Sequence, residues 1–115
     1  MLKKVNVLGT EYKIKHVSAE EIAKAMDANI GEYGGFCDAY SKEIAILKPQ
    51  DVMEGDELSF ERWIKEAVRH ELVHAFLNES GLKANSEWAR NEELVDWIAI
   101  QSPKIFKLFE ELEVL

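Results

Sequence analysis

Two histidines and a glutamate occur together in the segment His70-Glu71-Leu72-Val73-His74, an H-E-x-x-H pattern that uses two of the three histidines of the chain. If this segment is helical, the histidines lie one turn apart on one face, so both imidazoles can reach a single Zn²⁺ at about 2.0–2.1 Å. Glu71 projects from the same turn, where its carboxylate can take a proton from a zinc-bound water. The pattern predicts a zinc site with a general base beside it.

Glu71 occupies an unusual place on the predicted helix. At 100° per residue it falls near the middle of a broad apolar arc, between Phe60 and Ile64, while His70 and His74 lie at one edge of that arc. A carboxylate rarely occupies such a face unless it is paired, binds a metal or takes part in chemistry. This placement favours a metal site over a helix that carries two histidines by chance. The arc is formed by Phe60, Trp63, Ile64, Ala67, Val68, Leu72 and Ala75.

A catalytic zinc site usually has three protein ligands and one open position. The remaining histidine, His16, lies far upstream in a predicted strand. The longer H-E-x-x-H-x-x-G-x-x-H pattern fails because positions 77 and 80 are Leu and Ser, which excludes the metzincin class. The third ligand is therefore expected to be a carboxylate from a second helix.

The segment Asn91-Glu92-Glu93-Leu94-Val95-Asp96 supplies that carboxylate. Glu92 and Asp96 are four residues apart and share a helical face with apolar neighbours. Glu92 is the predicted third ligand, and Asp96 can accept the free ring N–H of a ligating histidine and fix its tautomer. Glu93, rotated by about 100°, is the second choice as ligand. The alternative is an ordinary acidic amphipathic helix.

The H-E-x-x-H pattern followed eighteen residues later by N-E-x-x-x-D resembles the gluzincin zinc peptidases, and the short chain resembles their minimal members, the minigluzincins and the ImmA/IrrE-like peptidases of phages and mobile elements. Residues 33–46 are similar to that family's hairpin before the zinc helix, although Ala39 and Tyr40 stand where a tighter turn is usual. The resemblance covers roughly residues 30 to 100. It implies a zincin-like fold and a metalloendopeptidase that cleaves a repressor-type regulator with one Zn²⁺ per chain. His70, His74 and Glu92 would be ligands, Glu71 the base and Asp96 a hydrogen-bond partner of a ligand.

Peptide hydrolysis also needs a donor for the tetrahedral oxyanion and a place for the substrate. Tyr40 and Arg90 are candidate donors, together with Tyr33 and His16, and the sequence does not choose among them. An extended substrate is expected to add to an edge strand, either 43–48 or 36–40.

Composition is typical of one globular domain, residues 1–115, with 47% hydrophobic and 31% charged residues. No stretch approaches twenty apolar residues, no secretory signal is visible, and the single Cys37 cannot form an internal disulfide, so a cytoplasmic protein is expected. The net charge of −8 argues against binding to nucleic acid phosphates. The sequence does not indicate the oligomeric state.

The pattern predicts an α+β domain, in which a small N-terminal antiparallel sheet with a short helix precedes the helices that carry the metal. Strands are expected at 2–7, 11–17, 35–40 and 43–48, with a helix from the capping box at Ser18 to about Asn29. The zinc helix should end near Ser80, before Gly81. A second helix should be capped by Asn85 or Ser86 and end near Gln101, and Ser102-Pro103 should begin a third.

Three alternatives differ from an active peptidase. One is a catalytically silent zincin-fold protein that acts as an acidic, protein-binding regulator, although a structural zinc site would not need Glu71. Another is an acidic interaction protein, such as a DNA mimic or antitoxin, that binds no metal. The last is a latent peptidase whose terminal segment, Pro103 to Leu115, covers the cleft, although packing into the core is the expected role of that segment.

Overall fold

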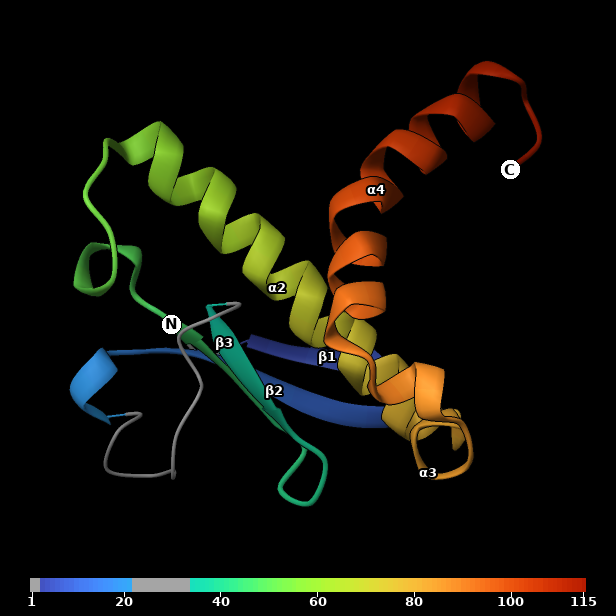
Figure 1. Cartoon of the computed structure of the whole chain (residues 1–115), viewed down its shortest axis with the longest axis horizontal. Helices are drawn as coiled ribbons and strands as arrows, with labels where there is room; N and C mark the ends of the chain where they lie inside the picture. Colours follow the sequence, from blue (N-terminus) through green and yellow to red (C-terminus); the bar gives the residue numbers. More distant parts are fainter. Residues whose placement is uncertain (1–2, 22–33) are drawn as a thin grey trace.

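The structure is a computed structural model, and it describes residues 3–21 and 34–115. It confirms the α+β class: a four-stranded sheet with the order β1-β2-β4-β3 is followed by helices (Figure 1). The helix predicted between Ser18 and Asn29 falls largely outside the described residues. Its start is visible, because the Ser18 hydroxyl accepts a hydrogen bond from the Glu21 N–H at 3.1 Å.

The first two strands, β1 (Lys3–Val7) and β2 (Thr10–Val17), form an antiparallel hairpin. Along β2, alternate residues are buried, which is the period of two expected for a strand with one face on the core. Leu8 and Gly9 both have positive φ, at 50° and 93°, as the tight hairpin turn requires. The Asn6 side chain accepts a hydrogen bond from the Gly9 N–H and supports this turn.

The prediction of a wholly antiparallel sheet is wrong at its centre. Strand β3 (Gly35–Asp38) pairs antiparallel with β4 (Glu43–Leu47), but β4 runs parallel to β2. A parallel pair needs a long connection, and the chain between β2 and β4 provides it. Strand β3 ends earlier than predicted because Asp38 turns the chain by accepting hydrogen bonds from the N–H groups of Tyr40 and Ser41.

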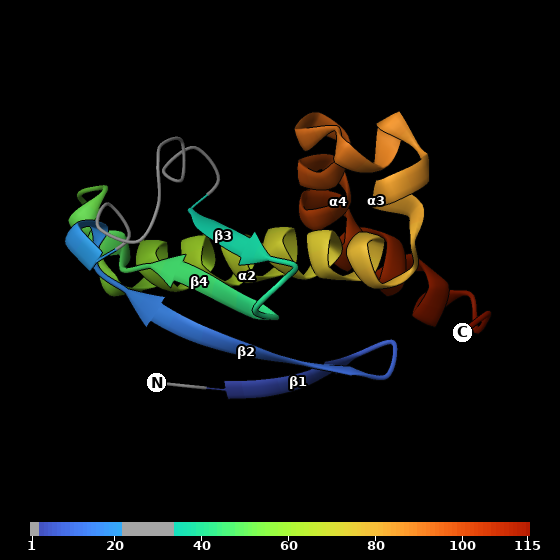
Figure 2. The ribbon, with the colours of Figure 1, turned by 90° about the horizontal axis from the view of Figure 1, so that it is seen from below.

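A short 3₁₀ helix, η1 (Pro49–Asp51), leads to helix α2 (Glu57–Glu79), which lies along one face of the sheet (Figure 2). The Asp56 side chain caps α2 by accepting a hydrogen bond from the Ser59 N–H. The core between helix and sheet is apolar and closely packed. Its buried members are Val7, Tyr12, Ile14, Ile44, Ile46, Ala67 and Ala75.

The end of α2 is joined to both hairpins by one carboxylate. Glu79 accepts hydrogen bonds from the Tyr12 hydroxyl at 2.6 Å, the Lys42 ammonium at 2.8 Å and the Thr10 hydroxyl at 3.0 Å. These donors hold the pKa of Glu79 at about 2, well below the ordinary value for a glutamate. The network fixes the position of α2 relative to the sheet.

After α2 the chain forms a short helix, α3 (Leu82–Asn85), a 3₁₀ helix, η2 (Glu87–Arg90), and the long helix α4 (Glu92–Glu111). The prediction of separate helices before and after Ser102-Pro103 is wrong, because α4 continues through Pro103. Proline lacks an N–H, so it cannot satisfy the carbonyl of Ala99 one turn earlier. Arg69 on α2 donates to that carbonyl instead.

The second half of α4 projects away from the sheet and from α2 (Figure 1). Its apolar side chains Phe106, Leu108 and Phe109 are exposed, and so is Leu112, the residue that follows α4. The expectation that this segment packs into the core is therefore also wrong. Within the described residues, no helix is long and apolar enough to cross a bilayer.

Candidate metal centre

Helix α2 brings its two histidines to the same face. The backbone is helical from Glu57 to Glu79, so His70 and His74 are separated by one turn, with their ring centroids 5.0 Å apart. His70 is 1% exposed and Glu71 is 3% exposed. This burial agrees with the helical periodicity, which predicts Glu71 near the middle of the apolar arc and His70 at its edge.

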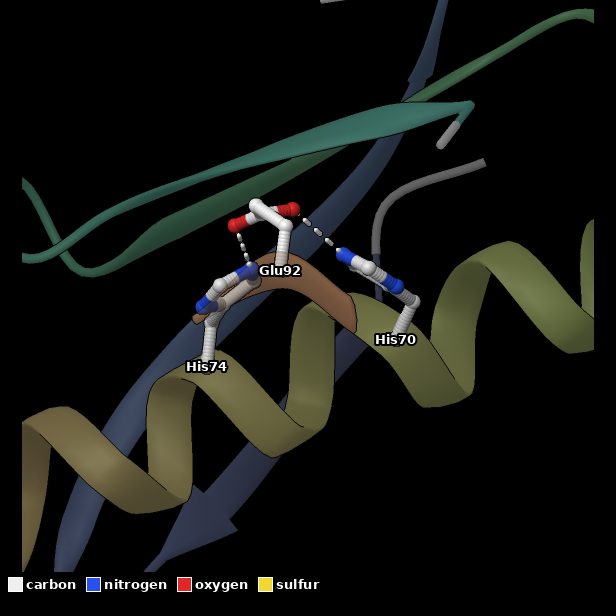
Figure 3. A group of neighbouring side chains, drawn as sticks. All are labelled: His70, His74 and Glu92. Carbon is white, nitrogen blue, oxygen red and sulfur yellow. Dashed lines mark hydrogen bonds and ion pairs between the residues drawn. The ribbon is translucent and has the colours of Figure 1, made fainter. Parts of the chain in front are cut away.

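Glu92 reaches both histidines from α4 (Figure 3). One carboxylate oxygen lies 3.0 Å from His70 Nε2, and the other lies 2.7 Å from His74 Nε2. Glu92 is the first residue of α4, and the side chain of Asn91 caps this helix by accepting a hydrogen bond from the Leu94 N–H. Because α4 begins at residue 92 and not near 85, Glu92 lies at a helix N-terminus, a place that favours a negative charge.

Asp96 contacts the other nitrogen of the His70 ring. Its Oδ1 lies 3.2 Å from His70 Nδ1, one turn along α4 from Glu92. An ionised carboxylate only accepts hydrogen bonds, and both ring nitrogens of His70 face one, Asp96 at Nδ1 and Glu92 at Nε2. A metal bound at Nε2 would leave the ring proton on Nδ1, where Asp96 can accept it.

His70, His74 and Glu92 form a group whose potential ligand atoms all lie within 4.8 Å of one another. Two ligands of a tetrahedral zinc ion are separated by about 3.3 Å when each lies about 2.0–2.1 Å from the metal. The observed carboxylate–imidazole separations of 2.7 and 3.0 Å are slightly shorter, so a small outward movement of Glu92 would admit an ion. Glu93, the second choice as ligand, is exposed and does not belong to this group. The donor set of two imidazoles and one carboxylate fits a divalent metal such as Zn²⁺.

Glu71 is held in a poorly solvated place. Burial, and to a smaller extent the negative charge of Glu92, raises the pKa of Glu71 to about 8. Gly35 at the start of β3 passes close to this side chain: a Cβ atom at Gly35 would lie 3.1 Å from Glu71 Cγ and 2.7 Å from the carbonyl oxygen of Ala45. A cation bound near Glu92 would lower the pKa of Glu71, because an opposite charge favours the ionised carboxylate.

The pKa of His74 is lowered, first by burial. The neighbouring Glu92 carboxylate acts in the opposite direction, but the effect of burial is larger. A neutral imidazole is the form that binds metals, so the environment of His74 favours ligation over protonation.

The structure describes three of the four predicted oxyanion donors, Tyr40, Arg90 and His16. Tyr40 is 98% exposed in the turn after β3. The Arg90 guanidinium donates to the carbonyl oxygen of Lys83 in α3. His16 is half-buried in β2 beside Ile46 of β4, and Tyr33 lies outside the described residues.

Cys37 on β3 is half-buried and receives a weak hydrogen bond from the Asn78 amide. Burial, followed by the nearby charge of Glu71, raises the pKa of its thiol to about 12. A thiol that resists ionisation is a poor metal ligand, and Cys37 does not belong to the metal-binding group.

Two residues that shape the site were not found by sequence reasoning. Gly35 is predicted only as the first residue of the expected strand 35–40, although a glycine at the start of a strand can indicate a close backbone approach. Arg69 lies on α2, and no local pattern in the sequence indicates its contact with Ala99.

Comparison of the chain with models of known protein families, with curated protein sequences and with solved structures finds no match.

Proposed function

We propose that this protein is a zinc-dependent metalloendopeptidase. The observation that carries the proposal is the position of Glu92, whose two oxygens lie beside the Nε2 atoms of His70 and His74 although it comes from a different helix. The buried Glu71 between those histidines supports a catalytic over a purely structural site, because a structural zinc site does not need an additional carboxylate.

His70, His74 and Glu92 would hold the metal, which when bound acts as a Lewis acid toward a water and the scissile carbonyl. Glu71 would accept a proton from the attacking water and deliver it to the leaving amine nitrogen. Asp96 would keep the His70 ring in the tautomer with its proton on Nδ1. The low exposure of His70 and Glu71 keeps bulk water away from the proton that Glu71 carries.

The substrate would lie extended along β3. Of the two strands first considered, β4 is paired on both sides, with β2 and with β3, so it has no free edge. Strand β3 is at the edge of the sheet and starts at Gly35, next to Glu71. Addition of a peptide strand to this edge would bring its backbone to the general base. A regulatory protein of the repressor type is the proposed natural substrate, on the resemblance alone.

Metal content tests the ligand set. We expect about one zinc per chain in the wild-type protein and a large loss of zinc in Glu92→Ala. Glu93→Ala is the matched control, because it removes the same charge from the adjacent, exposed position and should leave the metal content unchanged. Equal zinc content in the two variants would remove Glu92 from the ligand set.

Hydrolysis of a library of extended peptides tests the reaction. We expect cleavage by the wild-type protein, and none by Glu71→Gln despite full zinc content, because glutamine cannot accept the proton. Zinc binding without cleavage by the wild-type protein would support the catalytically silent regulator. Absence of bound metal, even after zinc is added, would support an acidic interaction protein.

A further inference from the structure

The second half of α4 carries a continuous apolar face that the described part of the chain leaves open to solvent. Ile105 is half-buried, whereas Leu108 is 52% exposed, Phe109 is 38% exposed and Leu112 is 63% exposed. An exposed apolar surface of this kind usually marks an interaction site. The second half of α4, which contains Pro103, projects away from the sheet and from α2 (Figure 1).

The spacing of these residues is that of a coiled coil. Ile105, Leu108 and Leu112 are separated by three and then four residues, the alternation that places side chains along one seam. Lys104 and Glu111 are seven residues apart and flank the seam on the same side. Neither of these two charged residues forms an ion pair within residues 3–21 and 34–115.

We propose that this face binds a second copy of the chain, with the two α4 helices antiparallel. In an antiparallel pair that brings Ile105 opposite Leu108 of the second copy, the flanking positions place Lys104 opposite Glu111 of the second copy. A two-fold axis would relate the two copies, so the Lys104–Glu111 ion pair and the Ile105–Leu108 contact would each occur twice. The surface is in this sense complementary to itself. In a parallel pair Lys104 would face Phe109, and no ion pair would form.

Charge complementarity therefore favours a second copy of the chain as the partner, with its α4 helix antiparallel. The contact is short, since the helix ends at Glu111. It is smaller than a standard interface of about 1,600 Å², so the dimer should dissociate on dilution. The contact involves neither His70, His74, Glu92 nor Glu71, so it does not depend on the proposed metal chemistry.

Sedimentation equilibrium of the full-length protein tests the proposal, over concentrations from about 1 µM to about 1 mM. We expect a reversible monomer–dimer equilibrium for the wild-type protein. Lys104→Glu and Glu111→Lys should each weaken association by about tenfold or more, because each replaces two attractive pairs by two repulsive ones. The double variant Lys104→Glu/Glu111→Lys restores both pairs and should return the dissociation constant to within about threefold of the wild-type value.

Lys107→Glu is the matched control. It makes the same change in net charge on the same helix, about 200° from Ile105 and therefore on the polar side, so association should change by less than about twofold. Circular dichroism checks that each variant remains helical. A wild-type protein that is monomeric throughout would overturn the proposal. Equal effects of Lys104→Glu and Lys107→Glu, or failure of the double variant to restore association, would also overturn it.

Discussion

The Arg69 side chain on α2 donates a hydrogen bond from Nε to the carbonyl oxygen of Ala99 on α4, at 2.6 Å. In an uninterrupted helix the N–H of residue 103 would occupy this acceptor, but residue 103 is proline. Ala99 is fully buried, so its carbonyl has little access to water as a substitute. A donor from α2 thus satisfies the carbonyl that Pro103 leaves without an intrahelical N–H, in the helix that carries Glu92 and Asp96.

Replacing Arg69 by methionine should lower the free energy of unfolding by about 1.5–3 kcal/mol, because the Ala99 carbonyl loses its donor. In a Pro103→Ala background the same replacement should lower the free energy of unfolding by a smaller amount, because the N–H of residue 103 can then donate to the Ala99 carbonyl. Urea unfolding of the four proteins in this double-mutant cycle measures the difference. Arg62→Met, at an exposed position of the same helix, should change stability by less than about 0.5 kcal/mol. Equal costs of Arg69→Met in both backgrounds would contradict the explanation.

Asp96→Asn should weaken zinc binding by about 10- to 100-fold, because an amide is a poorer and less oriented acceptor for the Nδ1–H of His70. Competition with a chromophoric chelator measures the affinity. Glu93→Gln removes the same charge from the same helix at an exposed position and should leave the affinity unchanged. Equal affinities of the wild-type protein and Asp96→Asn would show that Asp96 does not support the ligand.

Gly35→Ala should destabilise the protein by about 1–3 kcal/mol, because the new methyl group would lie 2.7 Å from the Ala45 carbonyl oxygen. It should also reduce hydrolysis by displacing Glu71, while zinc content is retained because the three atoms nearest to the new Cβ belong to Ala45, Ile46 and Glu71 and not to a proposed ligand. Gly55→Ala is the control, since its new Cβ would meet the flexible side chains of Ser59, Phe60 and Met53. Unchanged stability and hydrolysis in Gly35→Ala would mean that β3 can move away from α2 without cost.

Stability should depend on Glu79 at acid pH. Its pKa of about 2 in the folded protein is below the unfolded value of about 4.3, so its contribution is fully present above about pH 4.5. That contribution is lost as the pH falls toward about 2, when the carboxylate that accepts from Tyr12 and Lys42 becomes protonated. At neutral pH the urea midpoint of the wild-type protein should therefore be higher than that of Glu79→Gln. The two midpoints should converge at about pH 2. Glu66→Gln, at an exposed position on the same helix, should follow the wild-type curve.

Local patterns gave a good prediction of the elements before the site. The alternation in residues 10–17 and the 3.6-residue period around Glu71 identified a strand and a helix, and both were found. Periodicity also placed Glu71 on the buried face. These features depend on residues close together in the chain, so they can be derived without knowledge of its path.

Predictions that depended on distant partners were less successful. The parallel pairing of β2 with β4 could not be derived from the strands themselves, because the consecutive buried residues Ile44 to Leu47 indicate a central strand but do not fix its direction. The continuity of α4 through Pro103 has no local signal in the sequence, and the donor that satisfies the Ala99 carbonyl comes from Arg69, thirty-four residues before the proline.

The sequence by itself determined that His70 and His74 share a helical face with Glu71 beside them, since a spacing of four residues fixes that geometry in any helix. It also restricted the third partner to a short acidic segment, but it left Glu92 and Glu93 open. Only the tertiary structure brought Glu92 to both imidazoles, because the starting point of α4 and its packing against α2 decide which carboxylate points at the histidines. The physical reason is that helical periodicity acts over one turn, whereas the meeting of two helices depends on the packing of the whole chain.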